Sequence, residues 1–338
     1  SNGKRIVDTE FPIEDKFDYL PDDTRNGLIS RFLTIQEGCD RFCTFCVVPY
    51  TRGAEQSRSA VSIGAEARRL VSEGAREITL LGQNVNAWHG ESPSGGEWRL
   101  GRLICYLAEI QGLDRIRYTT SHPKDVDNEL IDAHRLVPQL MPFLHLPVQS
   151  GSDKILTAMN RRHSARDYFN IIEKLRKARP EIALSSDFIV GFPGEDNADF
   201  AQTLKMVNEI GYAQAYSFKY SARPGTPAAE ISDQVDNSVA IERLAGLQQL
   251  LRAQQDAFLA VQKGKRIEVL FEGQGKQEGQ ISGRSPYMHP VHVKAPRSFL
   301  GKIKEVHISE VMANSLSGAM VGKEKTNGVN FAEKETSL

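Results

Sequence analysis

The amino-acid sequence predicts an α/β fold: an open, partial (β/α)6 barrel followed by a small antiparallel β-barrel of OB-like size. Six apolar segments of strand character alternate with helical patterns over residues 32–220, and each strand ends in Gly, Pro, Ser, Asn or Gln. Such alternation favours a parallel sheet with helices outside it. Six units are too few for a closed eight-stranded barrel. After Gly264, five short strands separated by turns indicate the small β-barrel.

The elements follow one another in a regular order. In the first predicted helix, Ile63, Ala67 and Leu70 share one apolar face, and Gly74 marks its end. The parallel strands are predicted at residues 32–35, 77–81, 116–119, 143–146, 182–190 and 212–220. Helices are predicted at residues 62–74, 100–110, 127–136, in the stretch that ends at 179, and at 196–210 and 236–262. The five short strands are predicted at residues 267–271, 280–282, 291–293, 303–308 and 316–319.

Composition and charge divide the 338 residues into four parts. Residues 1–30 are polar and broken by prolines, so we expect a linker left from a preceding domain. Residues 31–261 form the parallel-sheet domain, 262–322 the small β-barrel, and 323–338 a polar tail that we expect to be disordered. The β-barrel holds nine Lys and Arg residues against five Glu residues, a net charge of +4 that leaves −5 elsewhere. A basic module on an acidic body indicates nucleic-acid binding.

The overall composition is that of a globular protein, with 40% hydrophobic and 25% charged residues. No apolar run approaches the length of ~20 residues that a membrane-spanning helix needs. The N-terminal residues do not have the pattern of a signal peptide. We therefore expect a cytoplasmic location and no membrane partner.

Three of the four cysteines, Cys39, Cys43 and Cys46, fall within eight residues. Three thiols cannot pair fully as disulfides, and nothing in the sequence indicates an oxidising compartment. A structural zinc site would need a fourth Cys or His ligand, yet the loop contains no histidine and Cys105 lies far along the chain in a helical pattern. Cysteine-only ligation with an open position favours an iron–sulfur cluster, while a zinc knuckle or a buried cysteine cluster remains an alternative.

The spacing Cys-x3-Cys-x2-Cys, with Phe45 before the third cysteine, resembles the cluster loop of radical S-adenosylmethionine (SAM) enzymes. The resemblance implies that the three cysteines hold three irons of a [4Fe–4S] cluster and that SAM binds the open fourth iron. It implies that one electron passes to SAM and that a 5′-deoxyadenosyl radical abstracts hydrogen. An open, partial barrel is also the fold of that family.

Further motifs narrow the resemblance to the methylthiotransferases, and among them to the branch that modifies tRNA. The match runs from about residue 31 to 321, and its C-terminal part is similar to the TRAM domain of these enzymes. It implies methylthiolation at C2 of N6-isopentenyladenosine beside the anticodon, with tRNA and an electron donor such as flavodoxin or ferredoxin as partners. Two alternatives are methylthiolation of a ribosomal protein and a non-enzymatic zinc or RNA-binding protein. The motifs span residues 46–53, 82–88, 119–123, 146–152, 187–195 and 220–227.

One departure from the family is large. Its full-length members begin with a domain that carries three more cysteines for an auxiliary cluster, and residues 1–38 contain no cysteine. We therefore expect a second [4Fe–4S] cluster only in the full-length protein. We expect the present chain to bind one cluster, to cleave SAM slowly and to make no methylthiolated adenosine.

The resemblance also suggests SAM contacts at the ends of the predicted strands. Phe45 and residues 189–191 are candidates to flank the adenine, and Gln83 and Asn84 to bind the methionine end of SAM. Loop capping is the alternative role for each position. The adenine candidates in 189–191 are Ile189, Val190 and Gly191, and the candidates for ribose or amino contacts are Ser121, Gln149, Ser150 and Asp187.

Several other residues carry weaker signals. Cys105 lies among Leu103, Ile104 and Leu107, so we expect it in the core. Trp88, His89 and Trp98 flank a Gly- and Ser-rich segment, for which we expect a flexible surface loop. The run Arg161-Arg162-His163 is interpreted as a solvated helix start, with phosphate contact as the alternative.

Overall fold

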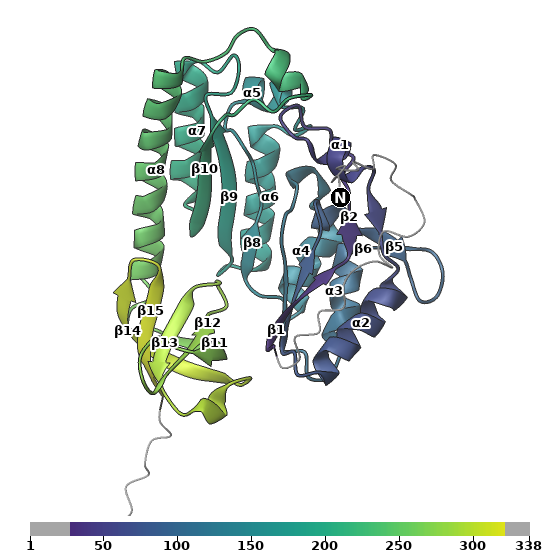
Figure 1. The fold of residues 1–338 in the computed structure, drawn as a ribbon, viewed down its shortest axis with the longest axis vertical. Coiled ribbons are helices and arrows are strands. Elements are labelled where there is room, and N and C mark those ends of the chain that lie inside the picture. Colours follow the sequence, from purple (N-terminus) through teal and green to yellow (C-terminus); the bar gives the residue numbers. More distant parts are fainter. Residues whose placement is uncertain (1–27, 322–338) are drawn as a thin grey trace, which may run out of the picture.

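The computed structural model describes residues 28–321. The expected linker therefore lies outside the described residues, apart from 28–30, and so does the expected tail at 323–338. Figure 1 shows two bodies joined by one long helix, α8: a domain of parallel strands with helices around it, and a small β-barrel.

All six predicted parallel strands are present: β1 (Ser30–Thr34), β4 (Glu77–Leu81), β7 (Arg115–Tyr118), β8 (Phe143–His145), β9 (Ala183–Val190) and β10 (Gln214–Lys219). They form two three-stranded sheets, in the orders β1-β4-β7 and β10-β9-β8, and every pair is parallel. One isolated bridge joins Ile116 of β7 to Leu140, which precedes β8 in the chain. No pairing between β1 and β10 closes the ring within residues 28–321. The predicted open (β/α)6 barrel is thus confirmed, with a break between β7 and β8 that the sequence did not predict.

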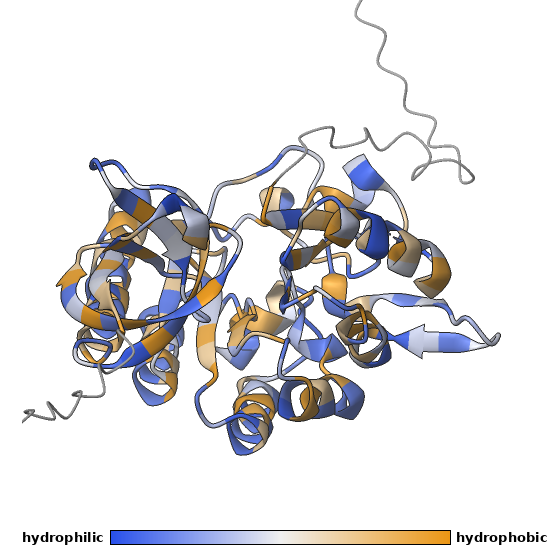
Figure 2. Ribbon diagram, turned by 90° about the horizontal axis from the view of Figure 1, so that it is seen from below, coloured by the Kyte–Doolittle hydropathy of each residue, from blue (hydrophilic) through white to orange (hydrophobic). Residues whose placement is uncertain are grey.

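Helices cover the outside of these strands (Figure 1). Their ends follow capping chemistry: the side chain of Ser59 accepts the Ser62 N–H at the start of α2, and Ser164 and Asp196 complete capping boxes for α6 and α7. In Figure 2, the helices carry hydrophilic and hydrophobic residues on different sides. The helices are α2 (Ala60–Ser72), α3 (Leu100–Ala108), α4 (Asn128–Leu136), α5 (Asp153–Ala158), α6 (Ala165–Ala178) and α7 (Asn197–Ile210).

The core of this domain lies between the strands and the helices. Leu33, Leu80, Ile116, Leu144 and Phe188 come from five different strands and are each fully buried. Burial of one such side chain stabilises the fold by about 1.5–3 kcal/mol. The apolar strand segments that the sequence shows are therefore what holds the sheet against its helices.

Helix α8 (Asn237–Ala260) packs against β10 and leads into the second body. That body is a closed barrel in the order β11-β12-β13-β15-β14, with its own core of residues such as Phe271 and Val306. The predicted five-stranded barrel is confirmed. One pair, β13–β15, is parallel, where an entirely antiparallel barrel was expected. The strands are β11 (Arg266–Gln274), β12 (Gln280–Arg284), β13 (Pro290–Lys294), β14 (Ile303–Met312) and β15 (Ser315–Met320).

Two arginines of β7 fix the β-barrel to the strand domain. Arg115 is fully buried and donates to the carbonyl oxygens of Glu268 and Arg284, at 2.9 and 2.8 Å. Arg117 donates to the carbonyl oxygens of Ser285 and Pro286, and its Nε forms a buried ion pair with Glu77 at 2.9 Å. Arg115 is the first residue of β7 and Arg117 the third, and Figure 1 shows the β-barrel at the end of the strand domain opposite α1.

Two expectations about individual residues were wrong. Cys105 is exposed, because Leu103, Ile104 and Leu107 form the buried face of α3 and the position between them points outward. Trp88 is fully buried, and its indole N–H donates to the Arg58 carbonyl at 3.0 Å. The segment after it is not an irregular loop but a hairpin of β5 (His89–Glu91) and β6 (Glu97–Arg99).

The remaining elements are short, and none of the helices described in residues 28–321 has the length and apolarity to cross a membrane. The short elements are β2 (Gln36–Glu37), α1 (Val48–Arg52), β3 (Gln56–Ser57), η1 (Val85–Ala87), η2 (Pro123–Asp125), η3 (Pro227–Glu230) and η4 (Arg297–Phe299).

Candidate cofactor site

The three-cysteine loop runs from β2 to α1, at the C-terminal edge of the parallel strands. It begins at Gly38, whose φ of +74° favours glycine, and a Cβ there would lie 2.1 Å from the Ala54 carbonyl oxygen. The Gly38 N–H donates to Oε1 of Gln83 at 2.6 Å, and the Gly38 carbonyl accepts from Gln36 at 2.7 Å. The start of the loop is therefore held by Gln36 of β2 and by Gln83, which follows β4.

The other side of the loop is held by the turn after α5. The backbone N–H of Thr44 donates to the Met159 carbonyl at 3.1 Å, and its hydroxyl donates to the Ala158 carbonyl at 2.8 Å. Nδ2 of Asn160 donates to the carbonyl oxygen of Phe42 at 2.9 Å. The loop thus spans two strand–helix units, which fixes its backbone independently of any bound group.

The three thiols of this loop are near enough to influence one another. The pKa of Cys39 is raised to about 11, mainly by burial; the hydrogen bond from the Arg41 backbone opposes the rise, and the charges of Cys43 and Cys46 contribute to it. Burial also raises the pKa of Cys46, with the charge of Cys43 adding to it and Arg161 opposing it. Thiols whose pKa is raised in this way, as those of Cys39 and Cys46 are, become thiolates when a positive group compensates them, as a metal centre does.

Arg161 contacts this thiol group directly. Its Nη1 donates to the sulfur of Cys43 at 3.4 Å, and its Nη2 donates to the Pro147 carbonyl at 2.5 Å. The backbone explains this placement, since Asn160 and Arg162 both adopt left-handed φ values, +56° and +55°, which turn the side chain between them inward. The expected solvated helix start is therefore wrong for Arg161. The positive φ values that place it were not evident from the sequence.

A cavity of about 300 Å³ opens beside the loop and gathers four of the predicted SAM contacts: Phe45, Gln149, Asp187 and Ile189. Gln149 has a left-handed φ of +79°, which is uncommon for a residue other than glycine. Its backbone accepts from Ile189 at 2.9 Å and donates to Asp187 at 2.9 Å. The ends of β8 and β9 are thus tied together at the cavity wall.

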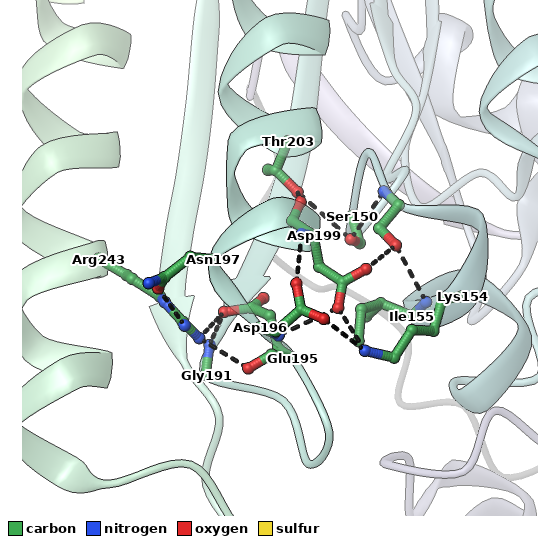
Figure 3. Close-up of polar contacts among 11 residues, drawn as sticks. Ser150, Lys154, Ile155, Gly191, Glu195, Asp196, Asn197, Asp199, Thr203 and Arg243 are labelled. Carbon is green, nitrogen blue, oxygen red and sulfur yellow. Dashed lines mark hydrogen bonds and ion pairs between the residues drawn. The ribbon is translucent and has the colours of Figure 1, made fainter.

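The other predicted SAM contacts do not line this cavity. Gln83 supports the cysteine loop, and Asn84 donates to Asp125 at 2.8 Å. Val190 is fully buried in the core. Ser150 lies 3.3 Å from the hydroxyl of Thr203, on the side of α7 (Figure 3). The Ser121 hydroxyl is buried and has no hydrogen-bond partner among the described residues.

Gly191 belongs to a polar network that supports the strand ends (Figure 3). Its N–H donates to Oε1 of Glu195 at 2.8 Å, and the same oxygen pairs with Arg243 of α8 at 2.8 Å. Burial raises the pKa of Glu195, and the bonds from Gly191 and Arg243 oppose that rise. This network holds the turn after β9 against α8. In these contacts Gly191 and Glu195 support the fold.

Two histidines behind the cysteine loop were not among the predicted site residues. The rings of His122 and His163 meet edge to face at 5.6 Å, and burial lowers the pKa of both, that of His163 to about 4. Both are therefore neutral at neutral pH. The Nε2 atom of each is buried without a partner among the described residues. Within residues 28–321, no three His, Cys, Asp or Glu side chains converge on a single-ion site.

The fold is an open β/α barrel with three cysteines grouped on one loop at its C-terminal edge. The chain belongs to the radical SAM superfamily: the model of the Radical SAM superfamily matches residues 33–207, more than half of the chain. The TRAM domain model matches residues 260–321. Membership implies a [4Fe–4S] cluster and SAM, and a TRAM domain indicates RNA binding. The three thiols on one loop and the cavity beside them, lined by Phe45, Gln149 and Asp187, fit such a pair of ligands.

Solved structures with similar folds are distant. The radical SAM methyltransferase TsrM from Kitasatospora setae, with cobalamin and a [4Fe–4S] cluster bound, is 16% identical, with a TM-score of 0.48 over 61% of this chain and 39% of that chain. Methylornithine synthase (PylB) is 15% identical, with a TM-score of 0.44 over 68% and 63%. SuiB from Streptococcus suis, bound to SAM, is 11% identical, with a TM-score of 0.47 over 68% and 48%. This chain thus spans less than two thirds of each.

Proposed function

We propose that this chain is the core of a tRNA methylthiotransferase of the MiaB type, acting at C2 of N6-isopentenyladenosine beside the anticodon. The observation that carries the proposal is the joining of a radical SAM domain to a TRAM domain through the buried side chains of Arg115 and Arg117. An RNA-binding module fixed to the barrel in this way holds a bound RNA at a constant distance from the cofactor site. The sequence motifs resemble those of the methylthiotransferases that modify tRNA, and for this reason we propose tRNA, not a ribosomal protein, as the substrate.

The cysteine loop would hold the cluster, with Cys39, Cys43 and Cys46 as thiolate ligands and Arg161 donating to the Cys43 sulfur. When bound, the cluster and SAM supply a one-electron reductive cleavage that yields the hydrogen abstractor. Such an abstractor reacts with whatever lies nearest, so the protein must position the substrate and exclude water.

The cavity walls have the chemistry to orient SAM. Phe45 and Ile189 offer apolar surface for an adenine ring. The carboxylate of Asp187 can accept from ribose hydroxyls or from an ammonium group, and the amide of Gln149 can both donate and accept. Six further residues remain proposed SAM contacts, although they do not line this cavity: Gln83, Asn84, Ser121, Ser150, Val190 and Gly191. Residues 31–261 and 262–322 are the domain bounds that we propose.

Three further parts of the proposal concern partners. An electron donor such as flavodoxin or ferredoxin would supply the electron. A second [4Fe–4S] cluster, where present, would be held outside residues 28–321. A cytoplasmic location follows from a tRNA substrate.

The test follows a hydrogen atom from the substrate. The reconstituted chain is incubated anaerobically with SAM, a reductant and tRNA that carries deuterium at C2 of N6-isopentenyladenosine. Deuterium in the released 5′-deoxyadenosine, measured by mass spectrometry, is the expected result, and it does not depend on sulfur delivery. Deuterium-free 5′-deoxyadenosine with this tRNA, together with transfer from a deuterated ribosomal protein, would overturn the tRNA assignment.

A further inference from the structure

A second and larger cavity lies at the junction between the parallel strands and the TRAM domain. Its volume is about 500 Å³, within the range of about 300–1,000 Å³ that small-molecule sites occupy. The strand domain contributes Tyr118, His145 and Tyr216 to its wall, and the TRAM domain contributes Arg284, His289 and Asn314. We call it the junction cavity.

The junction cavity is separate from the cavity beside the cysteine loop. His145 lines the junction cavity and Asp187 lines the cavity beside the cysteine loop. Nε2 of His145 lies 3.6 Å from Oδ1 of Asp187. Nδ1 of His145 lies 3.0 Å from the Ser185 hydroxyl. This row of polar contacts divides the inside of the open barrel into a cofactor end and a TRAM end.

An exposed aromatic ring marks the rim of the junction cavity. Tyr216 lies on β10, at the open edge of the barrel, and is 48% exposed although it lines a cavity. Its ring meets that of His145 at 6.1 Å, and its hydroxyl accepts from Nε2 of Gln214 at 2.7 Å. An aromatic ring that is held by neighbours and open to solvent is a stacking surface for a base.

The TRAM side supplies a buried polar group that lacks a partner. His289 is 8% exposed and lines the cavity, and its Nδ1 has no hydrogen-bond partner among the described residues. Burial lowers the pKa of His289 to about 4, so the ring is neutral and can either donate or accept at that nitrogen. The neutral ring of His289 and the amide of Asn314 suit the edge of a base, and the one charged residue named on this wall, Arg284, is paired with Glu272 at 3.3 Å.

We propose that the junction cavity binds one unpaired nucleobase of the RNA substrate, stacked on Tyr216 and contacted at its edge by His289. The proposal rests on the proposed function and extends it, because the bound base is not the one that reacts. The reacting base must reach the cofactor end, on the other side of His145 and Asp187. A neighbouring base held at the TRAM end would fix the register of the RNA.

The test measures RNA binding and base stacking together. The probe is an RNA stem–loop with 2-aminopurine at one loop position at a time, whose fluorescence falls when the base stacks. Tyr216→Ala should weaken binding about 5- to 150-fold, the range of one base–aromatic stack, and restore the fluorescence at one position. Tyr216→Phe should bind like the original chain. Leu136→Ala, which removes an exposed apolar side chain on the outer face of α4, is the matched control and should bind unchanged.

A cycle with abasic RNA makes the inference specific. Replacing the stacked base by an abasic site should weaken binding by a similar factor, and Tyr216→Ala should then cause no further loss. His289→Phe should likewise matter only for RNA that carries the base. Equal binding by Tyr216→Ala and the original chain overturns this proposal alone. A loss that persists with a fully abasic loop, or competition by a ribosomal-protein peptide for the Tyr216-dependent binding, also overturns it. Absence of any RNA binding by the original chain overturns both this inference and the tRNA function.

Discussion

The guanidinium of Arg161 donates a hydrogen bond to the sulfur of Cys43 across 3.4 Å. Both side chains are buried, with 5% and 8% of their surface exposed. A positive donor at a buried cysteine sulfur stabilises negative charge there, and a [4Fe–4S] cluster gains negative charge when it is reduced. The pair is therefore placed to raise the reduction potential of a cluster held by this loop.

Replacing Arg161 by Met should lower that reduction potential by roughly 60 mV, a tenfold change for one electron. The iron content should remain near that of the original chain, because no cysteine is lost. A redox titration followed by electron paramagnetic resonance measures the potential. Arg161→Lys should restore part of the shift, and Arg162→Met, at the exposed neighbouring position, should cause none. An unchanged potential in Arg161→Met would show that the hydrogen bond has no electronic role.

Each cysteine of the loop should be necessary for the cluster. Cys39→Ala, Cys43→Ala and Cys46→Ala should each abolish the brown, oxygen-sensitive chromophore after anaerobic reconstitution. The original chain should bind about four irons, as one [4Fe–4S] cluster on three thiolates requires. Cys105→Ala is the control and should bind iron normally, since Cys105 is exposed on α3, outside the loop. Normal iron content in any of the three loop variants would contradict the cluster assignment.

Local patterns in the sequence predicted most of the fold. The apolar spacing of Ile63, Ala67 and Leu70 placed α2, and alternating strands and helices indicated the open barrel. The cysteine spacing located the loop because its ligands are close in the chain. Phe45, Gln149, Asp187 and Ile189 share one cavity because parallel strands bring their C-terminal ends to one edge.

The parts that were not predicted depend on contacts between distant segments. Arg161 reaches Cys43 through an inward turn that two left-handed residues create, and no residue type in that run signals the turn. Cys105 has apolar neighbours in sequence, yet one step along a helix rotates a side chain away from the core. The junction cavity is lined by His289 from one domain and Tyr216 from the other, and no local sequence pattern brings them to one cavity.

Arg117 should be central to the docking of the TRAM domain. Arg117→Met removes donors to Ser285 and Pro286 and leaves the carboxylate of Glu77 buried without its partner. Breaking a buried pair in this way costs about 3–5 kcal/mol. Urea unfolding should show that loss and a separate transition for the TRAM domain. Arg102→Met, which removes a surface pair with Glu129, should cost under about 1 kcal/mol. If the two variants lost similar amounts of unfolding free energy, Arg117 would not be the residue that anchors the TRAM domain.

The basic residues of the TRAM domain should give RNA binding its dependence on salt. Lys276 and Lys294 lie near each other, because Gly275 bonds to Gln280 and Gln280 pairs with Lys294 in the β12–β13 register. Each phosphate contact contributes about −0.7 to the slope of log K against log salt for single strands. The variant Lys276→Gln/Lys294→Gln should therefore have a slope smaller by about 1.4. Lys174→Gln/Lys177→Gln on α6 is the control, and an unchanged slope in the TRAM variant would exclude these two lysines as phosphate contacts.

His134 should make the fold less stable in acid. The ring is fully buried, and its Nε2 lies 2.7 Å from the hydroxyl of Tyr118. Burial, with a smaller effect from the charge of Arg179, lowers its pKa in the folded chain from 6.5 to about 3. Between these two values the unfolded chain binds a proton at this site that the folded chain does not. Stability contributed by the neutral ring is complete above pH 6.5 and is lost as the pH falls toward 3.

The loss approaches about 1.4 kcal/mol per pH unit for one proton. In His134→Gln, the free energy of unfolding, measured in urea from pH 7 downward, should fall less steeply by that amount. Parallel pH profiles for the variant and the original chain would show that His134 is not the titrating group.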